Sequence, residues 1–413
     1  MIWKKLSEEI KYWGQVLLLP VYALSFLIPR DKKLWVYGST FGKRFADNPK
    51  YFYLYVNQHK SQDVNAVWIS KNKEIIRLLS ENKLEAYYIY SVKGLWYSLR
   101  AKVYLYDNYS KDICFWLSGG AVKINLWHGI PLKKINMDNK FDKVRHPGTN
   151  WLKIKYFLRR LSDEKPGHFV VTTSKYLEEI FSSAFATKHV IISGYPRNDI
   201  LTSKGIVNIL TEREADQLQN ILDRKKEQSA AKIILYMPTF RDSEQLFFRS
   251  IDKRELQDFL LQENIVLCIK PHPKSRCVSE YAYLESANIT VLDKEADPYV
   301  FLPHTDVLVT DYSSIYFDYL LLDKPIIFFN YDLEEYLSTS REMYFSYEAV
   351  TPGRIAQTFD EWKAAMLDAG AMLDQDRFQE ERKKLKELVF IEDNVEASER
   401  LYEYIQNLIH YNN

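Results

Sequence analysis

The sequence predicts an α/β protein in which two Rossmann-like domains face a cleft. Short apolar runs alternate with charged, helical stretches along most of the 413 residues, a pattern typical of βαβ units and mainly parallel sheets. The alternation occurs in two series of similar size, separated by a charged, helical stretch without motifs at residues 210–231. The conspicuous polar motifs come directly after apolar runs, where open parallel sheets bind their ligands.

The composition is that of an ordinary globular protein, with 46% hydrophobic and 27% charged residues. Fifty-six basic against 55 acidic residues give a net charge of +1, which does not support a general polyanion-binding role but allows local basic patches. Aromatic residues make up 15% and include 30 tyrosines, which suit either polyol ligands or a large sheet core. Three cysteines without a CxxC spacing predict a reducing compartment, and no histidine or cysteine pattern predicts a metal site.

The first 33 residues differ from the remainder of the chain. Residues 12–29 carry no charge, which is near the minimum length for a spanning helix, but Pro20 lies in the middle. Basic residues flank both ends, and no signal-peptide cleavage site follows. An interfacial anchor, a helix buried against the body and a true span all remain open. Aromatic residues interleaved with lysines favour the interface, so we expect a peripheral, membrane-associating helix on the cytoplasmic side.

After this segment we expect a first domain at residues 34–205 and a second at 206–390, followed by a C-terminal helix at 391–413 that packs back on the first domain. The strands expected in the first domain are residues 34–39, 64–70, 85–90, 101–108, 121–129, 168–174 and 189–199, with helices at 48–58 and 73–82. The strands expected in the second domain are residues 232–240, 264–273, 288–294, 305–314 and 324–330.

The sharpest motif of the second series is TDYSS at residues 310–314. A buried strand leads into Asp311, and Ser313 and Ser314 stand where a helix begins. Free backbone N–H groups and the positive end of the helix dipole make such a position an anion site. Acidic residues on each side, Asp311 and Asp318, strengthen the phosphate interpretation. Simple N-capping by serine is the alternative.

Two further motifs of the second series supply cationic and imidazole groups. Lys270 and His272 lie in the KPHP turn after a strand and are expected to point into the cleft, although such a histidine also serves to stabilise loops. Arg241 follows another strand in MPTFR. Its forked guanidinium suits a diphosphate, and a surface ion pair is the alternative.

The first series places His128 directly after a strand, in a turn shaped by glycine and proline. A histidine in such an exposed and constrained position is a candidate general base. The GYPRND motif ends the last strand of this series, and its Arg197 either reaches the cleft or pairs with Asp199.

Taken together, these strings resemble the CDP-glycerol:poly(glycerophosphate) glycerophosphotransferase family of teichoic-acid primases and polymerases. The matching strings are WHGIPLKKI, GYPRND, MPTFR, KPHP and TDYSSIYFDYLLLDKPIIFF followed by YDLEEY, in the family's order over residues 125–336. YDN at residues 106–108 and PG at 352–353 are further matches. The threonine that follows WHG in the family is Ile130 here, and residues 1–100 match only loosely.

The resemblance implies a GT-B fold and transfer of glycerol phosphate, or a related alditol phosphate, from a CDP-alditol to a lipid-linked or polymer acceptor at a bacterial membrane, with release of CMP. It implies no cofactor and no metal. By position, the family's functional histidines fall on His128 and His272. The residues implied to bind the donor are Arg241, Lys270, Thr310, Asp311, Ser313, Ser314 and Asp318.

Two other functions are weighed against this one. A glycosyltransferase of the same fold with an NDP-sugar donor would need an acidic residue for the sugar hydroxyls, for which Glu334 and Glu335 are candidates. A catalytically silent scaffold would not need to keep both histidines. Nucleic-acid binding has no basic and aromatic stripe to support it.

Overall fold

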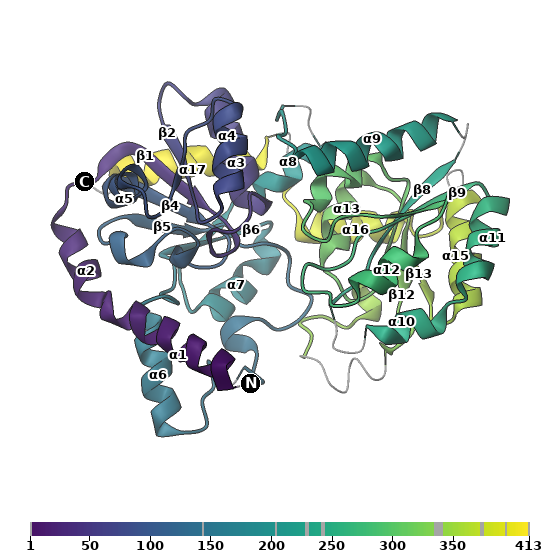
Figure 1. Cartoon of the computed structure of the whole chain (residues 1–413), viewed down its shortest axis with the longest axis horizontal. Helices are drawn as coiled ribbons and strands as arrows, with labels where there is room; N and C mark the ends of the chain where they lie inside the picture. Colours follow the sequence, from purple (N-terminus) through teal and green to yellow (C-terminus); the bar gives the residue numbers. More distant parts are fainter. Residues whose placement is uncertain are drawn as a thin grey trace. The chain divides into compact units, whose positions relative to one another are not determined.

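The computed structural model describes residues 2–142, 144–202, 205–227, 231–240, 244–333, 342–371, 376–392 and 395–411. The chain divides into two compact units, each containing one parallel sheet (Figure 1). The first unit comprises Met1–His128, Ile135–Ile209 and Phe390–Asn413, and the second comprises Gly129–Lys134 and Leu210–Val389. The predicted α/β class with parallel sheets is confirmed.

Seven parallel strands form the sheet of the first unit, in the order β3-β2-β1-β4-β5-β6-β7. Their bounds are Asp31–Gly38 (β1), Asn65–Ser70 (β2), Ala86–Tyr88 (β3), Ala101–Tyr106 (β4), Val122–Asn125 (β5), Phe169–Thr172 (β6) and Val190–Ile192 (β7). Val36, Val67 and Tyr104 belong to its fully buried core. The strand order reverses between β1 and β4, and ligands of such sheets bind at the carboxyl ends beside this reversal.

The helices of the first unit begin with polar side chains that satisfy free backbone N–H groups. Asn72, Ser91 and Thr149 each accept a backbone N–H from the first turn of α4, α5 and α6 respectively. The bounds are Ile2–Leu17 (α1), Leu19–Leu24 (α2), Asp47–His59 (α3), Lys73–Glu81 (α4), Val92–Arg100 (α5), Asn150–Leu161 (α6), Glu178–Phe185 (α7), Asp199–Thr202 (α8) and Ala397–Tyr411 (α17).

Six parallel strands form the sheet of the second unit, in the order β10-β9-β8-β11-β12-β13, which reverses between β8 and β11. Their bounds are Lys232–Met237 (β8), Ile265–Ile269 (β9), Ile289–Val291 (β10), Val307–Thr310 (β11), Ile326–Phe329 (β12) and Arg354–Ala356 (β13). Trp362 is fully buried in its core and stacks on Phe329 with ring centroids 4.7 Å apart. The helices are Glu212–Glu227 (α9), Gln245–Ser250 (α10), Lys253–Gln262 (α11), Val278–Leu284 (α12), Ile315–Tyr319 (α13), Phe359–Ala371 (α15) and Gln379–Val389 (α16).

The uncharged N-terminal stretch is not one continuous helix. Helix α1 ends at Leu17, and Pro20 occupies the first turn of α2, where a missing N–H is tolerated. The end of α2 is fixed to the first unit, because the Arg30 guanidinium donates to the carbonyl oxygens of Ser25 and Leu117 at 3.1 and 2.9 Å. Within the described residues, no helix combines the length and apolar character needed to cross a membrane.

We predict that Gly353→Ala destabilises the second unit. A Cβ at Gly353 would lie 2.1 Å from the carbonyl oxygen of Ile326 in β12, so the strand must shift. Overpacking of this kind costs about 1–3 kcal/mol of unfolding free energy, measurable by urea denaturation. Gly148→Ala is the matched control, since nothing lies within 4 Å of the added Cβ. Equal stability of the two variants would contradict the prediction.

Candidate functional site

His128 lies in a tightly bent turn directly after β5. The preceding Trp127 has a left-handed backbone (φ 55°), which is costly for a bulky residue. The conformation is held locally because the Trp127 N–H donates to Oδ1 of Asn125 at 2.8 Å. Asn125 in turn donates to the carbonyl oxygen of Asn108, in the YDN string, at 2.9 Å. The turn thus presents His128 at the carboxyl end of the sheet with an exposed side chain.

The contacts of the His128 ring define its tautomer. Nδ1 lies 3.2 Å from the carbonyl oxygen of Asp107. A carbonyl oxygen can only accept, so in the neutral ring Nδ1 carries the hydrogen and Nε2 keeps its lone pair. Nε2 has no hydrogen-bond partner within the part of the chain that the structure describes. The arrangement is that of a base able to accept a proton.

Two buried residues from distant segments support the His128 turn. Nδ2 of Asn48 donates to the carbonyl oxygens of Leu126 and Trp127 at 3.1 and 2.9 Å. Nη1 of Arg197 donates to the carbonyl oxygen of His128 at 2.8 Å. The WHG and PRND strings therefore meet at one turn, which explains in physical terms why both occur.

The ion pair that the structure shows for Arg197 is with Asp47 and not the one with Asp199 that the sequence suggested. Arg197 forms this ion pair at 2.8 Å and is itself only 4% exposed. Asp199 instead accepts the backbone N–H groups of Ala397 and Ser398 at 2.8 and 2.9 Å, at the start of α17. Burial raises the pKa of Asp199 to about 6, although these hydrogen bonds oppose the shift.

Sequence reasoning missed Asp47 and Asn48. They follow the loop after β1 and begin α3. The one sequence feature that could have indicated them is an acidic and an amide residue before Pro49 at the start of a helix. That pattern is common in ordinary helix caps and does not distinguish a supporting residue of the site. The left-handed backbone of Asp47 (φ 63°) becomes evident only in the structure.

In the second unit, His272 follows β9 and is half-buried. Its Nδ1 accepts the backbone N–H of Lys274 at 3.1 Å. The neutral ring therefore carries its hydrogen on Nε2 and is a donor there, the opposite tautomer to that of His128. The Phe240 ring lies against it, with centroids 5.7 Å apart. A fixed Nε2–H group suits an anionic oxygen.

Asp311 connects the two loops at the strand reversal of the second sheet. It is fully buried, and its carboxylate accepts the backbone N–H groups of Thr239 and Tyr312 at 2.9 and 2.6 Å. Thr310 is also buried and donates from Oγ1 to the carbonyl oxygen of Met237 at 2.8 Å. These contacts tie the loop after β8 to the loop after β11 and indicate positioning roles.

The remaining residues predicted to bind the CDP-alditol have different contacts. Ser313 and Ser314 are half-buried at the start of α13, where Oγ of Ser313 accepts the Ile315 N–H at 3.4 Å. Nζ of Lys270 donates to the carbonyl oxygen of Lys294 at 3.1 Å, at the end of β9. Asp318 is fully buried and accepts the hydroxyl hydrogen of Tyr299, which indicates a structural contact. Arg241, Glu334 and Glu335 lie outside the described residues.

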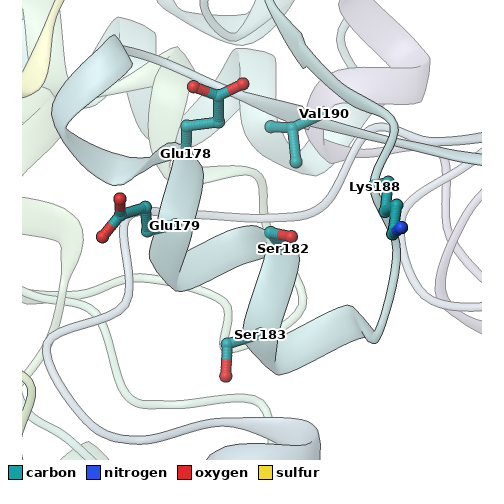
Figure 2. A pocket seen from close by; sticks show the side chains of 6 residues that line it. All are labelled: Glu178, Glu179, Ser182, Ser183, Lys188 and Val190. Carbon is teal, nitrogen blue, oxygen red and sulfur yellow. The ribbon is translucent and has the colours of Figure 1, made fainter.

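A cavity of about 320 Å³ lies beside α7, and none of the predicted site residues lines it. Figure 2 shows Glu178, Glu179, Ser182 and Ser183 projecting from this one helix, with Lys188 and Val190 on the segment that follows. Its lining contains no imidazole and only one cation. Within the described ranges, no three histidine, cysteine, aspartate or glutamate side chains form a group that could hold a metal ion.

We predict that Asn48→Ala lowers the unfolding free energy of the first unit by about 2–4 kcal/mol, because two buried carbonyl oxygens lose their donor. Asn82→Ala is the control, since Asn82 makes one exposed contact to Leu78 in the same unit and should change stability by under about 0.5 kcal/mol. Urea denaturation followed by tryptophan fluorescence measures both. A small effect of Asn48→Ala on the unfolding free energy would show that the His128 turn keeps its conformation without this side chain.

Comparisons with known proteins agree on the family. The profile of the CDP-Glycerol:Poly(glycerophosphate) glycerophosphotransferase family matches residues 21–407. The teichoic acid poly(glycerol phosphate) polymerase of Bacillus spizizenii is 30% identical over 367 residues, covering 83% of this chain and 86% of that protein. The teichoic acid glycerol-phosphate transferase of Staphylococcus aureus is 28% identical, covering 84% and 85%.

A solved structure of the wall teichoic acid polymerase TagF has a TM-score of 0.70 at 24% identity and covers 98% of each chain, so the two proteins share a fold. The family match extends well beyond the strings at residues 125–336, and the predicted resemblance is confirmed. The chain belongs to the CDP-glycerol:poly(glycerophosphate) glycerophosphotransferase family.

Proposed function

We propose that this chain transfers glycerol phosphate, or a related alditol phosphate, from CDP-glycerol or another CDP-alditol to a membrane-linked acceptor and releases CMP. The product belongs to teichoic acid or a capsule-type polymer. Family membership supports the reaction class, and the relatives named above are a glycerol-phosphate polymerase and a glycerol-phosphate transferase. The observation that carries the proposal is the exposed His128 ring. Its hydrogen lies on Nδ1, so Nε2 keeps a lone pair that can accept a proton.

In the proposed reaction, Nε2 of His128 takes the proton from the acceptor hydroxyl. The acceptor oxygen then attacks the β-phosphorus of the CDP-alditol. The bond between that phosphorus and the bridging oxygen breaks, and CMP leaves with the electron pair. The hydrogen bond from Nδ1 to the Asp107 carbonyl keeps the ring oriented while Nε2 carries the proton.

The second unit would hold the donor. The Nε2–H of His272 and the side chains of Lys270 and Arg241 supply positive or hydrogen-donating groups for the diphosphate, with Ser313 and Ser314 at the start of α13. Their effect is to position the donor and stabilise charge on the leaving phosphate. Thr310, Asp311 and Asp318 would act by fixing the loops. A GT-B arrangement with a cleft is part of this proposal.

The acceptor side would be attached to the cytoplasmic face of the membrane as a peripheral protein. Helix α6 packs beside α1, with the Trp13 and Trp151 rings 6.2 Å apart (Figure 1). Large apolar side chains on α1, α2 and α6 are exposed, which is typical of helices that lie in a membrane interface. These side chains include Ile10, Leu17, Leu24, Trp151, Ile154 and Phe157.

We predict that His128→Ala lowers the rate of transfer by about 10²–10⁴-fold, because a general base is lost. Its affinity for CDP-glycerol should stay close to that of the wild type. His272→Ala should weaken donor affinity and turnover together, since one charge-assisted contact is worth about 1.5–3 kcal/mol. CMP release with a soluble acceptor analogue measures the rate, and calorimetry measures donor binding.

His189→Ala is the control for the histidine variants, because the His189 side chain is exposed in the first unit and packs against Phe169, away from the predicted site residues. It should leave both rate and affinity unchanged. Near-normal turnover of His128→Ala would remove this residue from the mechanism. Unchanged donor affinity in His272→Ala would place the donor elsewhere.

A second prediction concerns the membrane. Leu17→Glu combined with Phe157→Glu should reduce binding to anionic vesicles by about tenfold or more, since each side chain contributes about 1.5–3 kcal/mol when buried in apolar surroundings. The two side chains are 77% and 61% exposed, so folding should be unaffected. Val92→Glu, at an 84% exposed position on α5, is the control. Equal vesicle sedimentation of both variants would contradict interfacial binding by α1 and α6.

A further inference from the structure

A cavity of about 630 Å³ lies in the first unit, between helices α1 and α6 and the loops that follow β1, β2 and β4. Phe41 and Lys43 come from the loop after β1, Lys71 from the end of β2, and Lys111 from the segment after β4. These loops lie at the reversal of the strand order, where open parallel sheets bind ligands. The cavity contains neither His128 nor its supporting residues in its lining.

The lining is strongly cationic. Five of its side chains are lysine or arginine and two are acidic, which leaves an excess of three positive charges at neutral pH. Lys155 is paired with Glu9, and both Lys111 and Arg159 are paired with Asp163. Within the described part of the chain, Lys43 and Lys71 form no ion pair. Glu164, just outside the lining, also pairs with Lys111 and Arg159. The uncompensated positive charge therefore lies on Lys43 and Lys71.

The ammonium group of Lys71 is positioned to bind an anion. Its ammonium donates to the carbonyl oxygens of Phe41 and Lys111 at 3.0 and 3.3 Å, which uses two of its three hydrogens. Desolvation lowers the pKa of Lys71. The Asp112 carboxylate opposes this shift, and the charges of Lys111 and Lys43 add to it. An anion bound between these lysines would relieve their mutual repulsion.

The loop that carries Phe41 is strained. Thr40, Phe41 and Gly42 all have positive φ angles of 49°, 59° and 77°. Buried carboxylates hold it in place, since Asp107 accepts the N–H of Thr40 and Asp112 that of Phe41 at 3.0 and 2.8 Å. Strain maintained by the surrounding structure is found mainly where a ligand binds or a reaction occurs.

The other wall of the cavity is apolar and aromatic. It includes Tyr12 of α1, Tyr90, Phe115 and Trp116, and Tyr90 and Phe41 are 60% and 41% exposed. The same α1 and α6 that close the cavity carry the exposed apolar side chains described above. A ligand that fits both walls has a phosphate group joined to an apolar chain.

We propose that this cavity binds the phosphate group of a membrane lipid, with the phosphate between Lys43 and Lys71 and the chain directed along α1 and α6. A free nucleotide would leave the exposed apolar helices unused, and a polymer of alditol phosphates has no apolar part. The lipid is either the lipid-linked acceptor or a bilayer glycerophospholipid. The inference rests on the proposed function only if the lipid is the lipid-linked acceptor.

The test is a titration of the full-length protein, followed by calorimetry, with short-chain lipids below their micelle concentration. Dihexanoyl phosphatidic acid represents the bilayer lipid, a single-chain alkyl phosphate represents the lipid-linked acceptor, and inorganic pyrophosphate represents free phosphate. The variants are Lys43→Glu alone and Lys43→Glu combined with Lys71→Gln. Lys83→Glu, at an exposed lysine in the turn after α4, is the matched control.

We expect saturable binding of at least one lipid phosphate, weakened about tenfold or more by the double change, since one charge-assisted contact is worth at least about one factor of ten. Lys43→Glu alone, at an exposed position, should give part of the loss, and Lys83→Glu none. The tighter of the two lipids identifies the source.

Absence of saturable binding, or equal binding by the double variant and the control, would overturn the inference. Pyrophosphate binding as tight as that of the lipids would overturn the lipid assignment. Transfer to a soluble acceptor, assayed in parallel, separates the two proposals: wild-type protein that binds lipid phosphate but transfers nothing would refute the proposed function and leave the cavity assignment standing.

Discussion

The ion pair between the buried Arg197 and the half-buried Asp47 fixes the backbone around the His128 turn. Arg197 also donates to the carbonyl oxygen of His128, so three distant segments meet at one guanidinium. Asp47 and Trp127 both have left-handed backbones, which cost about 1–3 kcal/mol each and persist only where other contacts compensate. Burial raises the pKa of Asp47 although the charge of Arg197 opposes it. Loss of Arg197 would leave a half-buried acid without its partner and two left-handed residues without their common support.

The two units use the same device at the reversal of strand order. In the first, Asp107 follows β4 and accepts the N–H of Thr40 in the loop after β1. In the second, Asp311 follows β11 and accepts the N–H of Thr239 in the loop after β8. In each unit a carboxylate on one side of the reversal holds the loop on the other side. The aspartates that stand beside the conspicuous motifs thus hold the loops at the strand reversal of each sheet.

Much of the fold follows from patterns that the sequence displays. Apolar runs predicted β1, β8 and β11 to within a few residues, because buried parallel strands need continuous apolar stretches. Tyr37, Tyr104 and Tyr236 are fully buried, so the core accounts for much of the tyrosine content. Helix α6 was not predicted from the sequence, because it follows a long irregular segment and its apolar residues lie on a surface instead of in a core.

Within the site, positions after strands were predictable, but roles were not: the burial of Asp318 and the partners of Asn48 depend on residues far away in sequence.

The two histidines hold opposite neutral tautomers, so adding a proton to each ring would have different local consequences. A proton added to His128 goes to Nε2 and leaves the Nδ1 hydrogen bond to Asp107 intact, so the ring stays in place and only its basicity is lost. A proton added to His272 must go to Nδ1, which would then face the N–H of Lys274, donor against donor. The proton would therefore preserve the contact that orients the first ring, whereas it would remove the contact that joins the second ring to the backbone of the KPHP loop.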